Sequence, residues 1–210
     1  QMCIRDSTNT VTKTIALGYL PENLFLNDNK IYVSNNGGNT VNVINTSTDT
    51  IENTITVTSA PSGFVKDAND KIWVLCSGIK TYNSDYSLDL ANSEAGALVR
   101  FDPSNFAVEQ TISFSSIPES PSRLTINKEA NILYYLNGGV YSFDINATAI
   151  STTPFIARSF YGLGFDPKNG TIYTGTYGFV SNQKLIRYNA NGIALDSAEV
   201  GIGPNGFVFR

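Results

Sequence analysis

The segment from Pro61 to Val74 recurs along the chain at nearly regular spacing, and this recurrence constrains the fold more than any other feature. Versions of it occur at 21–33, 121–134 and 160–173, and its first half returns at 204–208. The prolines Pro21, Pro61 and Pro121 stand 40 and 60 positions apart. The sequence therefore has a basic repeat of about 40 residues with one insertion.

Two further series of apolar segments complete each repeat. The first consists of runs that end on Asn or Asp, at 41–45, 98–102, 139–144 and 185–189. The second has the form Val/Ile-x-x-Thr-Ile and stands at 11–15, 51–55 and 108–112. Each repeat thus carries four short strands, which we call a, b, c and d. Repeats of this length with four strands are typical of β-propeller blades, whose sheets are buried against their neighbours. No segment has a sustained helical period, so we expect an all-β chain.

The repeat predicts four complete four-stranded blades and one extra strand at each end. The blades are expected at 20–60, 61–118, 119–158 and 159–202, with strand d at 8–19 and strand a at 203–210. Strands from both chain ends share one blade when a propeller closes, so we expect an arc of a seven-bladed ring, with about 100 residues upstream. Residues 1–7 fit no strand and resemble translated sequencing-adapter tails, so we expect a non-native tail there.

Composition narrows the classes of function. The net charge is −4 and no run of Lys or Arg occurs, which argues against nucleic-acid binding. No segment approaches the roughly 18 apolar residues of a membrane span. The chain has no histidine, and carboxylates such as Asp28, Asp67 and Asp166 fall in turns. We therefore expect no catalytic residue, no metal site and no cofactor. Trp73 and Cys76 lie within strand b of the second blade, where we expect core positions.

Candidate ligand-binding residues emerge where the repeats differ. The d-to-a corners and b-to-c loops open on one face of a propeller, and function concentrates on such loops. Where other corners hold Gly or Asn, the third blade holds Arg123. Arg123 is either a structural residue paired with Glu119 or a ligand contact, because a buried unpaired guanidinium would be costly. Arg158 and Tyr161, at the next corner, could join it.

Two b-to-c loops add aromatic candidates. The second blade inserts 77–96, with Tyr82 and Tyr86, and the fourth blade carries Tyr177 and Phe179. Long loops in tight repeats are usually functional or disordered. Rigid aromatic side chains suit a flat or bulky ligand, although packing within the loops explains them equally well.

The repeat motifs resemble those of the YVTN-repeat, YncE-like propeller family over residues 8–210. The segment Lys30-Ile31-Tyr32-Val33-Ser34-Asn35, followed by Gly38-Asn39-Thr40-Val41 and Val43-Ile44-Asn45, is similar to the YVTN pattern with Ser in place of Thr. The segments at 73–78, 121–124, 134–141, 160–164 and 204–207 resemble a branch of surface-layer-type propeller lipoproteins of Gram-negative bacteria.

This resemblance implies a seven-bladed, exported and non-enzymatic protein on the outer-membrane surface or in the periplasm. Some relatives capture cobalamin and pass it to a TonB-dependent transporter, so the resemblance implies a small-molecule ligand, for which a corrinoid is the candidate. Two alternatives stay open at this stage. One is a surface scaffold that binds proteins without a small ligand, and the weaker one is an enzyme of the propeller lactonase type.

Overall fold

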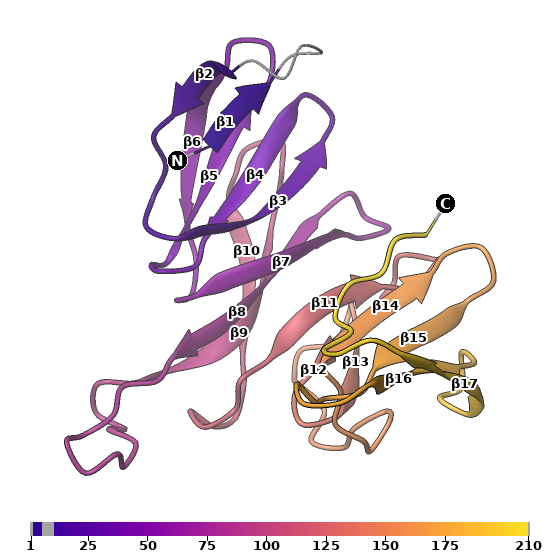
Figure 1. Cartoon of the computed structure of the whole chain (residues 1–210). Helices are drawn as coiled ribbons and strands as arrows, with labels where there is room; N and C mark the ends of the chain where they lie inside the picture. The colour runs from indigo at the N-terminus through magenta and orange to yellow at the C-terminus, as the bar shows by residue number, and fades with distance from the viewer. Residues whose placement is uncertain (1, 6–10, 210) are drawn as a thin grey trace. The chain divides into compact units, whose positions relative to one another are not determined.

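A computed structural model describes residues 2–5 and 11–209, and every regular element in them is a β-strand (Figure 1). This confirms the prediction of an all-β chain. The chain divides into two compact units, Gln1–Phe64 with Ile72–Ser120, and Val65–Lys71 with Pro121–Arg210. Within the described part no apolar helix long enough to cross a membrane is found.

The first two predicted blades are four-stranded antiparallel sheets whose strands follow chain order. The first sheet contains β3 (Pro21–Asn27), β4 (Lys30–Asn35), β5 (Thr40–Asn45) and β6 (Thr50–Thr56). The second contains β7 (Pro61–Lys66), β8 (Ile72–Ile79), β9 (Glu94–Phe101) and β10 (Val108–Ser113). These strands correspond to a, b, c and d of each repeat (Figure 1).

The turns that link strand a to strand b explain why each hairpin closes where it does. Asp28, Asp70 and Ala130 have φ angles of 53°, 61° and 53° in these turns, in the left-handed region that Asp tolerates better than most residues. The carboxylate of Asp67 also accepts hydrogen bonds from the backbone N–H groups of Asn69 and Lys71, at 2.8 and 2.9 Å. Such side-chain bonds to the turn backbone fix the register of the strands that follow.

The core of the first unit lies between the two sheets. Alternating positions of β4, β5, β8 and β9 supply its buried side chains, among them Tyr32, Val74 and Phe101. The rings of Tyr32 and Phe101 lie 5.6 Å apart. Trp73 and Cys76 are fully buried as predicted, and burial raises the pKa of the Cys76 thiol. Apolar residues at every second position of these strands therefore pack together in the interface between the two blades.

Tyr32 carries a hydroxyl that finds no hydrogen-bond partner within the described residues, although the side chain is fully buried. Burial raises the pKa of this hydroxyl to about 12. A buried polar group without a partner costs about 1–3 kcal/mol. We therefore expect Tyr32→Phe to raise the free energy of unfolding by about 1 kcal/mol, measured by urea denaturation. A decrease would show that the hydroxyl is satisfied in solution.

The second unit contains the last two predicted blades. Its first sheet has three strands, β11 (Ser122–Ile126), β12 (Ile132–Leu136) and β13 (Val140–Asp144). Its second sheet has four, β14 (Gly162–Asp166), β15 (Thr171–Gly175), β16 (Gln183–Tyr188) and β17 (Ala194–Val200). Buried residues of both sheets form one cluster, in which Tyr134 stacks on Phe165 with ring centroids 6.0 Å apart.

The third blade differs from the prediction because its strand d does not form. Only an isolated bridge between Val140 and Ile156 replaces it. The segment lacks the Val-x-x-Thr-Ile pattern of the other blades, and Pro154 has no N–H to donate. The Ser151 hydroxyl instead accepts a hydrogen bond from the Thr153 N–H, at 3.1 Å. Such local bonds compete with strand pairing.

The expected strand a at 203–210 is also not a strand over its described part, which ends at 209. The segment nevertheless lies against the last sheet, where the ring of Tyr173 contacts Phe207 at 6.1 Å and Phe209 at 5.2 Å. Val208, between them, is 87% exposed. The alternation of contacting and exposed side chains is thus retained, although this segment pairs with no strand of the described chain.

At the other end, β2 (Val11–Ile15) forms the described core of the predicted strand d, since positions 8–10 lie outside the described residues. It pairs with β1 (Met2–Arg5) in a separate two-stranded sheet. Positions 1, 6 and 7 of the expected non-native tail lie outside the description as well. The foreign origin of the tail stays a prediction.

Candidate functional site

Arg123 lies in an irregular stretch of β11, where the pairing with β12 shifts between Ser122 and Thr125. Such bulges redirect side chains. Arg123 has a φ of 57°, a conformation that costs a non-glycine residue about 1–2 kcal/mol. Its Nε donates to the carbonyl oxygen of Tyr161 at 3.2 Å, and its Cζ lies 5.4 Å from the centre of the Tyr161 ring. The side chain is exposed and held by this tyrosine.

Glu119 is the residue that the sequence analysis named as a structural partner of Arg123. Its carboxylate accepts a hydrogen bond from the Ser115 hydroxyl.

Tyr161, Tyr177 and Phe179 form one group of rings, which we call the ring cluster. Tyr177 and Phe179 each meet Tyr161 edge to face, with centroids 5.8 and 5.0 Å away, and they lie 5.0 Å from each other. Tyr177 is 65% exposed and Phe179 52%. Four of the predicted residues, Arg123 and these three, are therefore brought together on the surface of the second unit.

Backbone contacts position the ring cluster. The N–H of Tyr161 donates to the carbonyl of Gly175 at 2.8 Å, and the N–H of Gly203 donates to the carbonyl of Gly178 at 3.1 Å. Gly203 has a φ of 61°, and a Cβ at this position would lie 3.3 Å from the Phe179 ring. The positive φ favours a glycine here, and a Cβ would also require the Phe179 ring to shift by a few tenths of an ångström. The segment after β17 thus supports the rings.

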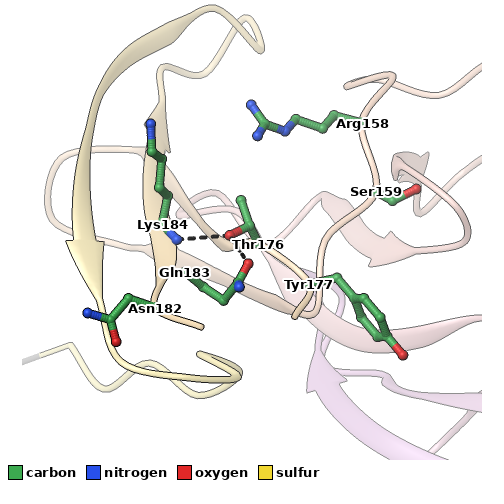
Figure 2. A pocket seen from close by; sticks show the side chains of 7 residues that line it. All are labelled: Arg158, Ser159, Thr176, Tyr177, Asn182, Gln183 and Lys184. Carbon is green, nitrogen blue, oxygen red and sulfur yellow. Dashed lines mark hydrogen bonds between the residues drawn. The ribbon is translucent and has the colours of Figure 1, made fainter. Parts of the chain in front are cut away.

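A pocket of about 480 Å³ lies beside the ring cluster (Figure 2). We call it the cationic pocket. Its lining residues come from the segment before β14, the β15–β16 connection and the first two residues of β16: Arg158, Ser159, Thr176, Tyr177, Asn182, Gln183 and Lys184. Two of these side chains are positively charged and none is a carboxylate. Tyr177 belongs to both the pocket and the ring cluster.

The floor of the cationic pocket is built by hydrogen bonds around Thr176. Its hydroxyl accepts from the Lys184 N–H at 2.8 Å and donates to the Gln183 side-chain carbonyl at 2.9 Å, as Figure 2 shows. Its own N–H donates to the carbonyl of Lys184 at 2.9 Å. These bonds join Thr176 to the first two residues of β16. They fix the position of the Lys184 backbone, from which its side chain extends.

A second pocket of about 300 Å³ shares Arg158 and Lys184 with the first and includes Asp196 on β17. Asp196 forms a bidentate ion pair with Arg187 on the neighbouring strand. The hydrogen bond from Arg187 lowers the pKa of the Asp196 carboxyl, and Asp196 raises the pKa of Arg187. The carboxylate of Asp196 is therefore already engaged.

The remaining predicted residues, Tyr82 and Tyr86, lie in the first unit on the long connection between β8 and β9. They are 60% and 89% exposed, and neither ring contacts another aromatic ring of the described chain. The connection is held by its own hydrogen bonds, such as those from Ser87 to Asp85 and from Asn92 to Asp89. These bonds lower the pKa of both carboxyls. The loop thus packs through polar groups and leaves its tyrosines at the surface.

Sequence reasoning missed Lys184 and its neighbours in the cationic pocket. A signal existed, because the position five residues before the final Asn or Asp of strand c is Thr40, Ala97 or Gly139 in the other blades, whereas the fourth blade places Lys184 there. The described residues contain no group of three or more His, Cys, Asp or Glu side chains that could hold a metal ion.

Comparison with known proteins supports the fold. No family model matches the chain, and no curated protein matches it. Similar solved structures are hydrazine synthase of Kuenenia stuttgartiensis (TM-score 0.65, 13% identity, 90% of this chain and 52% of that one) and dihydro-heme d1 dehydrogenase NirN in complex with DHE (TM-score 0.64, 10% identity, 97% and 43%). A candidate 6-phosphogluconolactonase from Bacteroides uniformis ATCC 8492 is similar as well (TM-score 0.59, 16% identity, 98% and 64%).

These three proteins agree with the chain in fold alone, because their sequence identities are low. The chain spans between 43% and 64% of their lengths. Together with the sheets described above, the likeness establishes a partial β-propeller.

Proposed function

We propose that the protein is a non-enzymatic binding propeller that holds a bulky, flat small molecule on the ring cluster. The observation that carries this proposal is the convergence of Tyr161, Tyr177 and Phe179, half or more exposed in the last two cases, beside the guanidinium of Arg123. Rigid aromatic side chains offer a large contact area at low entropic cost. A cation beside them adds attraction for the π-face of a ligand or for its polar groups.

A corrinoid is the first candidate for this ligand, and the proposed setting is the surface or periplasmic side of an outer membrane. In this setting the protein would hand the corrinoid to a TonB-dependent transporter. The supports are the motifs at 30–45 and 134–141, which resemble those of exported propellers, and the exposed aromatic rings that the ring cluster offers beside Arg123. NirN, a propeller-like neighbour, was solved in complex with DHE, so a protein of similar fold holds an organic ligand.

Calorimetric titration of the full chain with cyanocobalamin tests the corrinoid version. We expect saturable heat at tens of micromolar ligand, and about tenfold weaker binding for Tyr177→Ala, because a ligand-stacking aromatic ring contributes about 0.5–1.5 kcal/mol beyond its area. Tyr19→Ala is the matched control, since Tyr19 is 72% exposed and lies in the first unit. Absence of heat in the unsubstituted chain would refute a corrinoid ligand.

A protein-binding scaffold is the second candidate, because the same surface exposes aliphatic side chains. Val180 is 96% exposed and Ile202 57%, next to Phe179 and Gly203 respectively. Exposed apolar groups beside a polar rim are typical of protein contacts. Pull-down from outer-membrane extracts separates the two candidates. A scaffold that uses this surface would lose its partner in the Val180→Ser variant and would show no heat with cyanocobalamin. Retention of the partner by Val180→Ser would place the contact elsewhere.

A further inference from the structure

We propose that the cationic pocket binds an oxyanion, a carboxylate or phosphate group, through Arg158 and Lys184. This inference rests on the proposed function only for the rest of the ligand, which would lie on the ring cluster. The proposal names the chemistry of one ligand group and assigns two residues to it, one of which, Lys184, had no role in the sequence analysis.

The two cations enter the pocket from different segments. Figure 2 shows Arg158 extending from the segment before β14 toward the wall that carries Lys184 on β16. The Arg158 guanidinium is placed over the Phe160 ring, with Cζ 5.9 Å from its centre, and the Arg158 N–H donates to the carbonyl of Ile156 at 2.9 Å. Lys184 is anchored through its backbone to Thr176. The Arg158 guanidinium is therefore placed by its contact with Phe160, and the strand position from which the Lys184 side chain extends is fixed.

Neither cation has an ion-pair partner within the described part of the chain. Asp196 is paired with Arg187, as described above. Glu199 stands opposite Lys184 in the pairing of β16 with β17, but it does not line the cationic pocket, and its carboxylate accepts a hydrogen bond from the Asn182 side chain at 2.8 Å. Two like charges around one pocket repel each other, and an oxyanion between them removes that repulsion and gains charge-assisted hydrogen bonds.

The size of the pocket indicates that the oxyanion belongs to a larger molecule. A volume of about 480 Å³ falls within the usual range of small-molecule sites, about 300–1,000 Å³. A lone phosphate or carboxylate would leave most of it to water. Because Tyr177 lines the pocket and is also part of the ring cluster, a ligand on the rings would lie next to the pocket.

Titration of the full chain with inorganic phosphate, and separately with propionate, tests this site by NMR. The signals to follow are the Nε–Hε group of Arg158 and the backbone amide of Lys184. We expect saturable shifts at both, with the tighter anion identifying the phosphate or carboxylate class. Arg158→Gln or Lys184→Gln should weaken binding about tenfold, since a charged hydrogen bond contributes about 1.5–3 kcal/mol. Lys168→Gln, an exposed cation in the β14–β15 turn, is the control and should change nothing.

Linear, non-saturating shifts with both anions would overturn the proposal, and so would equal losses in the Lys168 control. The outcome is separate from that of the corrinoid titration. Saturable phosphate or propionate binding without cyanocobalamin heat would leave the oxyanion site standing and refute only the corrinoid. Cyanocobalamin heat unaffected by both glutamine substitutions, with no anion binding, would leave the ring cluster standing and refute the oxyanion site.

Discussion

Replacing Phe101 by alanine is expected to lower the free energy of unfolding by about 3–5 kcal/mol. The side chain is fully buried in the core of the first unit, and its ring packs 5.6 Å from that of Tyr32. Its removal leaves a cavity between two sheets whose backbones are held by hydrogen bonds and cannot collapse to fill it.

Urea denaturation followed by circular dichroism measures this loss. Val108→Ala is the matched control, because Val108 pairs with Phe101 across β10 and β9 but is 41% exposed. The control should change the unfolding free energy by less than about 1 kcal/mol. Equal effects of the two substitutions would contradict the core packing described here.

Gly175→Ala is expected to displace the segment at 203–209 from the last sheet. A Cβ at Gly175 would overlap the carbonyl oxygen of Pro204, and a Cβ at its partner Gly162 would lie 2.6 Å from the same atom. Because the atom nearest to each added Cβ is a backbone oxygen, no flexible side chain can move aside to make room. Since Gly203 supports the Phe179 ring, the substitution should also loosen the ring cluster and weaken ligand binding about tenfold.

Limited proteolysis with chymotrypsin reads out the displacement, because Phe207 and Phe209 lie on Tyr173 and become accessible when the segment leaves. We expect cleavage near these residues at least several times faster than in the unsubstituted chain. Gly201→Ala is the control, since a Cβ there meets open space. Unchanged cleavage in Gly175→Ala would show that the segment is not seated on the sheet.

The architecture could be predicted because its signals are local and repeated. A left-handed residue in the a-to-b turn and alternating apolar strands recur in each blade, so each copy supports the others; the turn residues are Asp28, Asp70, Ala130 and Gly170. The structure differs from the predicted architecture in two segments, and in both the formation of a strand depends on whether a neighbouring strand pairs with it. Residues 146–158 form no strand because Pro154 and local hydrogen bonds oppose one, and residues 203–209 have no described strand beside them.

The candidate site was predicted in part for the same reason. Comparison of equivalent corners identified Arg123, Arg158 and Tyr161, which differ from their counterparts. Lys184 was missed because a lysine at the start of a strand is common at surfaces, and only the fold places it across a pocket from Arg158. Whether Tyr82 and Tyr86 contact a ligand stays a prediction, because exposure alone does not identify a binding residue.

The third sheet ends at β13, with a single bridge to Ile156 where its neighbours have a complete fourth strand. Beyond the bridge at Val140, no further strand of the described chain pairs with this side of β13. Local opening of β13 therefore breaks fewer interstrand hydrogen bonds than local opening of β16, which has a strand on each side, and its amides are the more open to exchange with solvent.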